Sequence, residues 1–172
     1  MKTNSYLSAL IVSAVTFVAF GNARAAEPDE PAVIVKKLYA ARTDDSPVFN
    51  QTDDRAILDR FFRKDLADMI WKDAKDANGE MGALDFDPLY YSQDPQITDF
   101  DPGETGWGGD KKGGGENDAV VQTTFKDNGE ERMISYQFER DSETKEWKIF
   151  DIKYPDDRRL VEIFRGEEAP EP

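Results

Sequence analysis

A run of apolar residues at helical spacing sets the fold class of this chain. Between positions 53 and 77 the apolar side chains recur every three or four residues, which is the period of one helix face. Thr52-Asp53-Asp54 offers an N-cap before this segment, and Asn78-Gly79 is a typical helix stop. The pattern predicts one long helix over residues 53–77 that buries Ile57, Leu58, Phe61, Phe62, Leu66, Met69 and Ile70.

A shorter helix is expected before it. Pro31 suits the first turn of a helix, and the apolar residues that follow it lie at near-helical spacing as far as position 42. The segment Thr43–Pro47 is polar and ends in proline, so it breaks the pattern. The sequence therefore predicts two N-terminal helices, over residues 31–42 and 53–77.

The second half of the chain changes to the period of β-strands. Residues 119–125, 133–138 and 147–154 alternate between two faces, and Asn128-Gly129 is a strong signal for a tight hairpin turn. In the third strand, Phe150, Ile152 and Tyr154 are expected on one face and Trp147 and Ile149 on the other. Helices followed by an antiparallel meander predict an α+β fold, in which two helices pack on a curved antiparallel sheet around a cone-shaped hollow.

The segment between the helices and the strands is expected to be irregular. Residues 80–118 lack a clear period, and glycines crowd into a Gly-rich loop at 103–115. No Gly-Lys-Ser/Thr follows these glycines, so they do not form a phosphate-binding loop. The loop is interpreted as a flexible connector. Near the end of the chain, residues 160–164 predict a short helix.

The first residues have the pattern of an export signal. Lys2 precedes an uncharged, mostly apolar run that is shorter than a membrane span, and Ala23 and Ala25 occupy the small-residue positions of a cleavage site before Ala26. The expected division is a signal peptide at 1–25, an acidic tether at 26–30, one α+β domain at 31–164 and a disordered acidic tail at 165–172. The mature protein is expected to be periplasmic or secreted and not to span a membrane.

Composition excludes several chemistries. The chain has 22 basic and 36 acidic residues, a net charge of −14, and neither histidine nor cysteine. Serine–histidine triads, thiol nucleophiles and the usual zinc sites therefore have no residues to use. So negative a chain is not expected to bind nucleic acid. No cofactor, metal site or catalytic residue is predicted.

Three short segments carry a resemblance to a known family. They are Leu84-Asp85-Phe86-Asp87-Pro88-Leu89, Ser92-Gln93-Asp94 and Glu146-Trp147-Lys148-Ile149-Phe150-Asp151-Ile152. In this order, after a signal peptide and two helices, they resemble the DUF3828 family of small exported bacterial proteins, over about residues 31–164. The resemblance implies a nuclear-transport-factor-like (NTF2-like, cystatin-like) cone and supplies no catalytic residues. The histidine–aspartate pair common among enzymes of that superfamily is absent, and the Gly-rich insert departs from the family pattern.

Two groups of residues are candidates for ligand contact. Asp85 and Asp87, with Tyr90 and Tyr91 nearby, would point to one side of an extended segment, where paired carboxylates share a proton or hold a cation. The alternative is that these acids cap backbone N–H groups and begin the turn at Pro88. The aromatic residues Trp107, Tyr136 and Trp147 are either walls of a pocket or parts of the core.

The sequence predicts an exported, non-enzymatic binding domain for an unknown small ligand. One alternative is an immunity-type inhibitor that binds a basic protein partner through its acidic surface. A third reading is a hydrolase or isomerase with Asp85 or Asp87 as its base.

Overall fold

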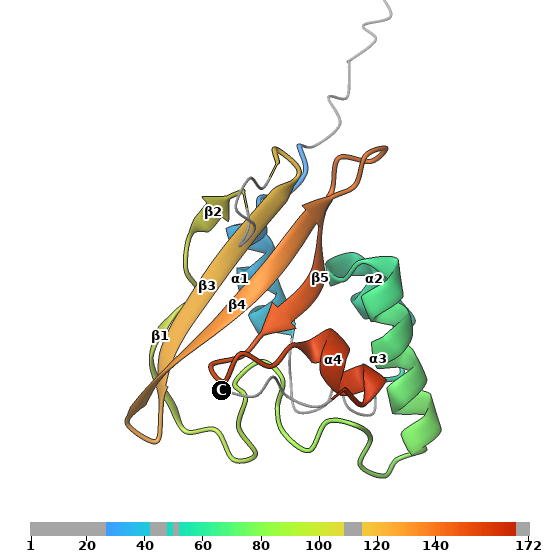
Figure 1. The fold of residues 1–172 in the computed structure, drawn as a ribbon, viewed down its shortest axis with the longest axis vertical. Helices are drawn as coiled ribbons and strands as arrows, with labels where there is room; N and C mark the ends of the chain where they lie inside the picture. Colours follow the sequence, from blue (N-terminus) through green and yellow to red (C-terminus); the bar gives the residue numbers. More distant parts are fainter. Residues whose placement is uncertain (1–26, 42–47, 50–51, 109–114, 168–172) are drawn as a thin grey trace, which may run out of the picture.

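The computed structural model describes residues 27–41, 48–49, 52–108 and 115–167. The predicted signal peptide, with Ala23, Ala25 and Ala26, lies outside these residues, as do positions 168–172 of the predicted tail. The elements in chain order are α1 (Pro31–Ala41), α2 (Arg55–Phe61), α3 (Lys64–Ala77), β1 (Ile97–Asp101), β2 (Thr105–Trp107), β3 (Asp118–Asp127), β4 (Glu130–Arg140), β5 (Trp147–Lys153) and α4 (Leu160–Arg165) (Figure 1). The predicted α+β class, the first helix, the meander and the final helix are confirmed.

The sheet is open and antiparallel. It has five strands in the order β1-β3-β4-β5, and β2 pairs with β3 on the same side as β1. The central pair β3–β4 is in register from Asp118 opposite Glu139 to Asp127 opposite Glu130. Five consecutive residues of β4, from 134 to 138, are buried, so both faces of the sheet are covered at its centre.

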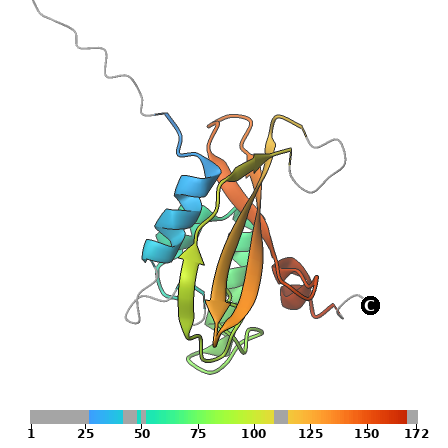
Figure 2. The same ribbon diagram turned by 90° about the vertical axis from the view of Figure 1, so that its left-hand side faces the viewer.

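Helices lie on both faces and beyond one edge of this sheet. Figure 2 shows α1 and α4 on opposite sides of the strands, and Figure 1 shows α2 and α3 beyond β5. The α1 face carries the inward side chains Ile134, Tyr136 and Phe138 of β4, all fully buried. One continuous hydrophobic core therefore joins the helices to the sheet.

The predicted single helix over 53–77 is wrong, because the chain leaves the helix at Phe62 and Arg63. Both residues have extended backbones. Phe62 forms a parallel bridge to Ile149, and the Arg63 N–H donates to the Ile149 carbonyl at 2.8 Å. Successive side chains on a helix point about 100° apart, and the break allows both Phe61 and Phe62 to be buried. Three helices, rather than two, precede the sheet, and the break covers the edge of β5.

The predicted facing of β5 is also wrong. The pairing of β4 with β5 shifts register between Gln137 and Phe138, which places Ile149 opposite Phe138 and Ile152 opposite Tyr136. Cross-strand partners share a face, so Ile149 and Ile152 point to the same side. The shift marks a β-bulge, which strict alternation does not anticipate.

The segment 80–118 is not wholly irregular, because it contains β1 and β2. Both strands pair with β3 and are separated by a turn at Gly103. Gly103 has a φ of +80°, and a Cβ there would lie 2.2 Å from the Gln122 carbonyl oxygen. This glycine allows close contact with β3, whereas positions 109–114 of the Gly-rich loop lie outside the described residues.

Gly129→Val is expected to destabilise the protein by about 1–3 kcal/mol. Asn128 and Gly129 both have positive φ values, 52° and 86°, which confirms the predicted hairpin turn. No atom lies within 4 Å of a Cβ built at Gly129, so the cost comes from the backbone alone. Thermal and denaturant unfolding measure the effect. Gly115→Val is the matched control, because a Cβ there also meets nothing; an equal loss in both variants would contradict the expectation.

Candidate functional site

The structure separates the predicted site residues into two groups. Asp85, Asp87, Tyr90 and Tyr91 belong to the loop that runs below the sheet in Figure 1, between α3 and β1. Tyr136 joins this group through Tyr39 of α1. Trp107 and Trp147 lie at the end of β2 and the start of β5, with ring centroids 5.7 Å apart. The candidates therefore do not form one pocket.

Asp87 has the geometry of the capping alternative. Its carboxylate accepts the Leu89 N–H at 2.9 Å, and its carbonyl accepts the Tyr91 N–H at 2.7 Å. Its own N–H donates to the Ser92 carbonyl at 2.8 Å, which closes the turn. Asp85 is exposed. No cluster of three or more potential metal-binding side chains occurs in the part of the chain that the structure describes.

The tyrosines of the first group pack into the core. The Tyr136 hydroxyl donates to the Tyr39 hydroxyl at 2.8 Å, and the Tyr39 hydroxyl donates to the Leu89 carbonyl at 2.7 Å. Tyr90 packs on Tyr39, with centroids 5.6 Å apart. Tyr91 stacks on Tyr154 at 4.4 Å. These contacts hold the loop against α1 and the sheet. A role of Tyr90, Tyr91 and Tyr136 in ligand contact stays a prediction.

In an alkaline titration, Tyr39, Tyr136 and Tyr154 are expected to stay neutral well above pH 10 until the protein unfolds. Burial raises the pKa of each of these phenols. The unfolded pKa is about 10. Their contribution to stability is therefore complete below that pH and is lost as the pH rises above it. Phenolate absorbance and circular dichroism, followed together, check this. Early ionisation of all the tyrosines without unfolding would show that the cluster is open to water.

A cavity of about 540 Å³ lies at the other end of the sheet. It is open to solvent on one side and is bordered by α1, the end of α2, the start of β5 and the segment before α1. Its lining residues are Glu27, Pro28, Asp29, Ile34, Lys37, Arg60, Phe61, Glu146, Trp147 and Lys148. Trp147 is the one predicted site residue among them, and its indole is largely buried. This cavity is the candidate functional site.

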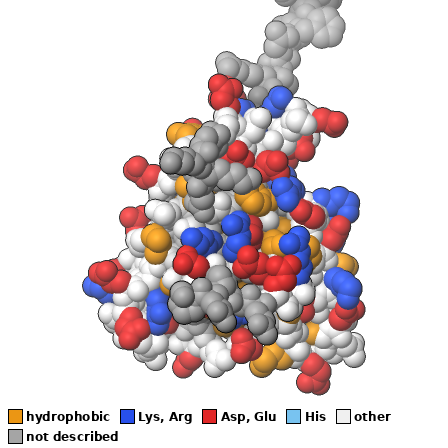
Figure 3. All heavy atoms as spheres, in the orientation of Figure 1, with side chains coloured by type: hydrophobic (Ala, Val, Ile, Leu, Met, Phe, Trp, Pro, Cys, Tyr) orange, Lys and Arg blue, Asp and Glu red, His pale blue; other side chains and the backbone are white. Residues whose placement is uncertain are grey.

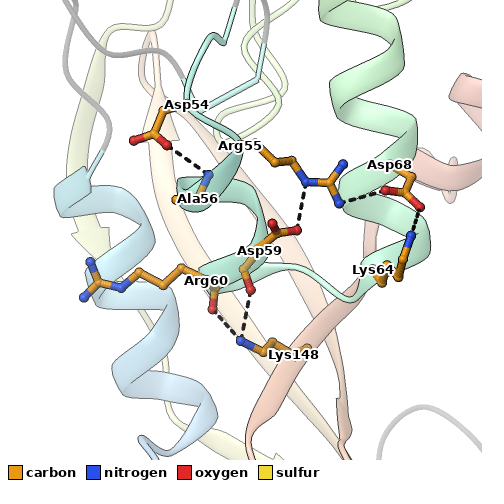
Figure 4. Close-up of polar contacts among 8 residues, drawn as sticks. All are labelled: Asp54, Arg55, Ala56, Asp59, Arg60, Lys64, Asp68 and Lys148. Atoms are coloured by element: carbon orange, nitrogen blue, oxygen red, sulfur yellow. Dashed lines mark hydrogen bonds and ion pairs between the residues drawn. The ribbon is translucent and has the colours of Figure 1, made fainter.

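Lys148 fixes the end of α2 beside β5. Its Nζ donates to the carbonyls of Asp59 and Arg60 at 3.0 and 3.1 Å (Figure 4). These are C-terminal carbonyls of α2, where a cation is favourable. Lys148 also pairs with Glu146 at 3.1 Å, and Lys37 of α1 pairs with Asp29. Two of the three cations that line the cavity are therefore engaged by the protein itself.

Arg60 differs from these two lysines. Its guanidinium lies over the Phe61 ring, 5.2 Å from the centroid, and extends from α2 toward α1 in Figure 4. No hydrogen bond or ion pair joins this guanidinium to another described residue. Sequence reasoning missed Arg60, because the local pattern does not show which of the charged residues on the polar face of this helix lack a partner.

A second cavity, of about 640 Å³, lies near the β3–β4 turn. Its lining residues are Asp99, Thr124, Phe125, Lys126, Glu131, Arg132, Met133 and Pro155. Lys126 pairs with Asp99 at 2.7 Å, and Arg132 pairs with Glu130 at 2.8 Å. Both cations of this cavity already have anionic partners, so it offers a ligand less than the first cavity does.

Comparisons with known proteins leave the family open. No protein-family model matches the chain, and no curated protein matches it. A similar solved structure is a phospholipid-binding protein from Ralstonia solanacearum in complex with a phospholipid, with 18% identity and a TM-score of 0.32. The match covers 60% of this chain and 50% of that chain, so this chain spans about half the length of that protein. At this level of similarity the neighbour does not indicate a ligand for this chain.

The helices of the described residues are also too short or too polar to cross a lipid bilayer.

Proposed function

We propose that this chain is an exported, non-enzymatic binding domain, and that the cavity between α1, α2 and β5 holds its ligand. The observation that carries the proposal is the cavity itself. Its volume of about 540 Å³ is in the range of small-molecule sites. Phe61 and Trp147 supply aromatic walls, and six charged residues, three acidic and three basic, supply polar contacts.

The chemistry of the lining favours binding over turnover. Asp29 and Glu146 each form an ion pair with a lysine of the same cavity, so neither carboxylate is left as an unengaged proton acceptor. The chain has no histidine or cysteine to act as a base or nucleophile. The third possibility, a hydrolase or isomerase that uses Asp85 or Asp87, is less favoured, because the Asp87 carboxylate caps a turn and Asp85 is exposed to solvent.

The proposed place in a DUF3828-like family with an NTF2-like cone rests on the sequence motifs and on the order of elements. Helices come first and an antiparallel meander follows. The strand motif from Trp147 to Ile152 forms β5, which lines the cavity at Trp147 and Lys148.

Export is part of the proposal, and the mature chain is expected to begin at Ala26. The small residues Ala23 and Ala25 precede this position in the pattern of a signal-peptidase site. Mass spectrometry of protein from the extracytoplasmic fraction tests this. A membrane-bound form that retains Met1 would contradict it.

The binding role is tested by native mass spectrometry of the purified mature protein. The expected result is a small retained mass that is lost on denaturation and absent from Trp147→Ala. Trp71→Ala is the control, because Trp71 lies on α3 and does not line the cavity. A retained basic protein would favour the inhibitor alternative. Equal retention of the small mass by both variants would contradict the assignment of this cavity.

A further inference from the structure

Basic side chains of this acidic protein are mostly paired with carboxylates. Figure 3 shows acidic and basic side chains interspersed over one face of the molecule. The described cations that form ion pairs are Lys37, Arg55, Arg63, Lys64, Lys72, Lys126, Arg132, Lys148, Lys153, Arg159 and Arg165. Six of the 17 described cations have no such pair, and Arg60 is the one among these six that lines the cavity.

Arg60 is placed to bind an oxyanion next to an apolar surface. A guanidinium presents five N–H donors in a planar fork that matches two oxygens of one anionic group. Its position over the Phe61 ring limits its movement without using those donors. Ile34, Phe61 and Trp147 provide apolar wall around the same space. The cavity thus combines one cation that has no carboxylate partner among the described residues with a small apolar surface in an otherwise charged lining.

The charge of the lining limits the anion to a small number of charges. Three acidic residues, Glu27, Asp29 and Glu146, line the cavity with the three basic ones. Repulsion from acidic residues elsewhere on the protein is screened beyond about 8 Å at physiological ionic strength. The attraction between Arg60 and an anion bound to it is hardly screened, because the two groups would be at hydrogen-bond distance. A polyanion would meet the acidic lining directly, so one anionic group is favoured.

Resting on the proposed function of this cavity, we infer that its ligand is a small organic anion. A single carboxylate, sulfonate or phosphate group accepts hydrogen bonds from the Arg60 guanidinium, and a flat apolar body lies against Phe61 and Trp147. The sulfonate-bearing dye 8-anilinonaphthalene-1-sulfonate has this composition. N-phenyl-1-naphthylamine has the same aromatic body without the charge.

Titrating each dye into the folded protein, with fluorescence as the readout, tests the inference. The wild-type protein is expected to bind the sulfonate dye at one site, more tightly than the uncharged dye. Arg60→Gln is expected to weaken binding of the sulfonate dye about tenfold, the value of one charge-assisted hydrogen bond, and to leave the uncharged dye unaffected. Lys36→Gln is the matched control, because it removes the same charge from an exposed position of α1 outside the cavity.

The outcomes separate this inference from the proposed function. If both dyes bind, are lost in Trp147→Ala and are unaffected by Arg60→Gln, the cavity is a binding site and the anion inference is wrong. An equal effect of Arg60→Gln and Lys36→Gln would likewise overturn it, since net charge alone would then explain the loss. If neither dye binds the wild-type protein at a site sensitive to Trp147→Ala, the proposed site itself is wrong.

Discussion

Phe62→Ala is expected to lower the free energy of unfolding by about 3–5 kcal/mol, the usual cost of removing a buried phenylalanine. The side chain is 1% exposed, and its ring packs against Phe49 with centroids 5.5 Å apart. The cavity left behind would lie where α2 ends, α3 begins and the chain bridges to β5 at Ile149. Because a typical domain has about 5–15 kcal/mol of stability, this loss is large. Equilibrium denaturation in urea measures it.

Phe100→Ala is the matched control for this experiment. Phe100 lies on β1 and is 40% exposed, although its ring meets Tyr39 at 4.7 Å. Its truncation removes little buried surface and one aromatic contact, so a loss of no more than about 1.5 kcal/mol is expected. A fully stable Phe62→Ala protein would contradict the burial of this side chain and would indicate that the α2–α3 junction faces a partner instead.

The first helix and the meander could be predicted, because the spacing of their apolar residues follows from which side of each element faces the core. The apolar period of residues 31–41 and the alternation within β3 both arise from burial on one side. Asn128-Gly129 adds a local signal, because a turn with two positive φ values suits few other residue pairs. These features involve residues close together in the chain, so they can be recognised from one sequence without the structure.

Features that depend on distant partners could not be predicted in the same way. The helix break at Phe62 has no proline or glycine to mark it and results from hydrogen bonding to Ile149, far along the chain. β1 contains two aspartates, which are depleted in strands, and it forms because β3 is available for pairing. Both cases are tertiary effects that override local preference.

The candidate site was predicted only at Trp147. Aromatic residues were selected as possible pocket walls, and composition cannot separate a wall from the core. Tyr136 is fully buried, whereas Trp147 lines the cavity. Arg60 was missed for a different reason. Its availability depends on which other cations are paired, and only the three-dimensional arrangement shows that Lys37 and Lys148 are engaged.

Asp151→Ala is expected to destabilise the protein by about 2–4 kcal/mol, because this buried carboxylate fastens α4 to the sheet. It accepts the Arg159 Nε–H at 2.6 Å, and the N–H groups of Ile152 and Val161 at 2.8 and 3.2 Å. Its side chain is 6% exposed and that of Arg159 is 34% exposed, so the cost is lower than for a fully buried pair.

Hydrogen exchange should locate this loss, because the amides of α4 lose their anchor first and are expected to exchange faster in Asp151→Ala. Asp59→Ala is the matched control: its ion pair with Arg55 is on the surface, where such pairs contribute at most about 1 kcal/mol. Asp151→Asn keeps the shape and one acceptor oxygen, so it is expected to fall between the control and Asp151→Ala. If Asp151→Ala is no less stable than Asp59→Ala, α4 is held by Leu160 and Ile163 packing alone, and the role assigned to Asp151 is wrong.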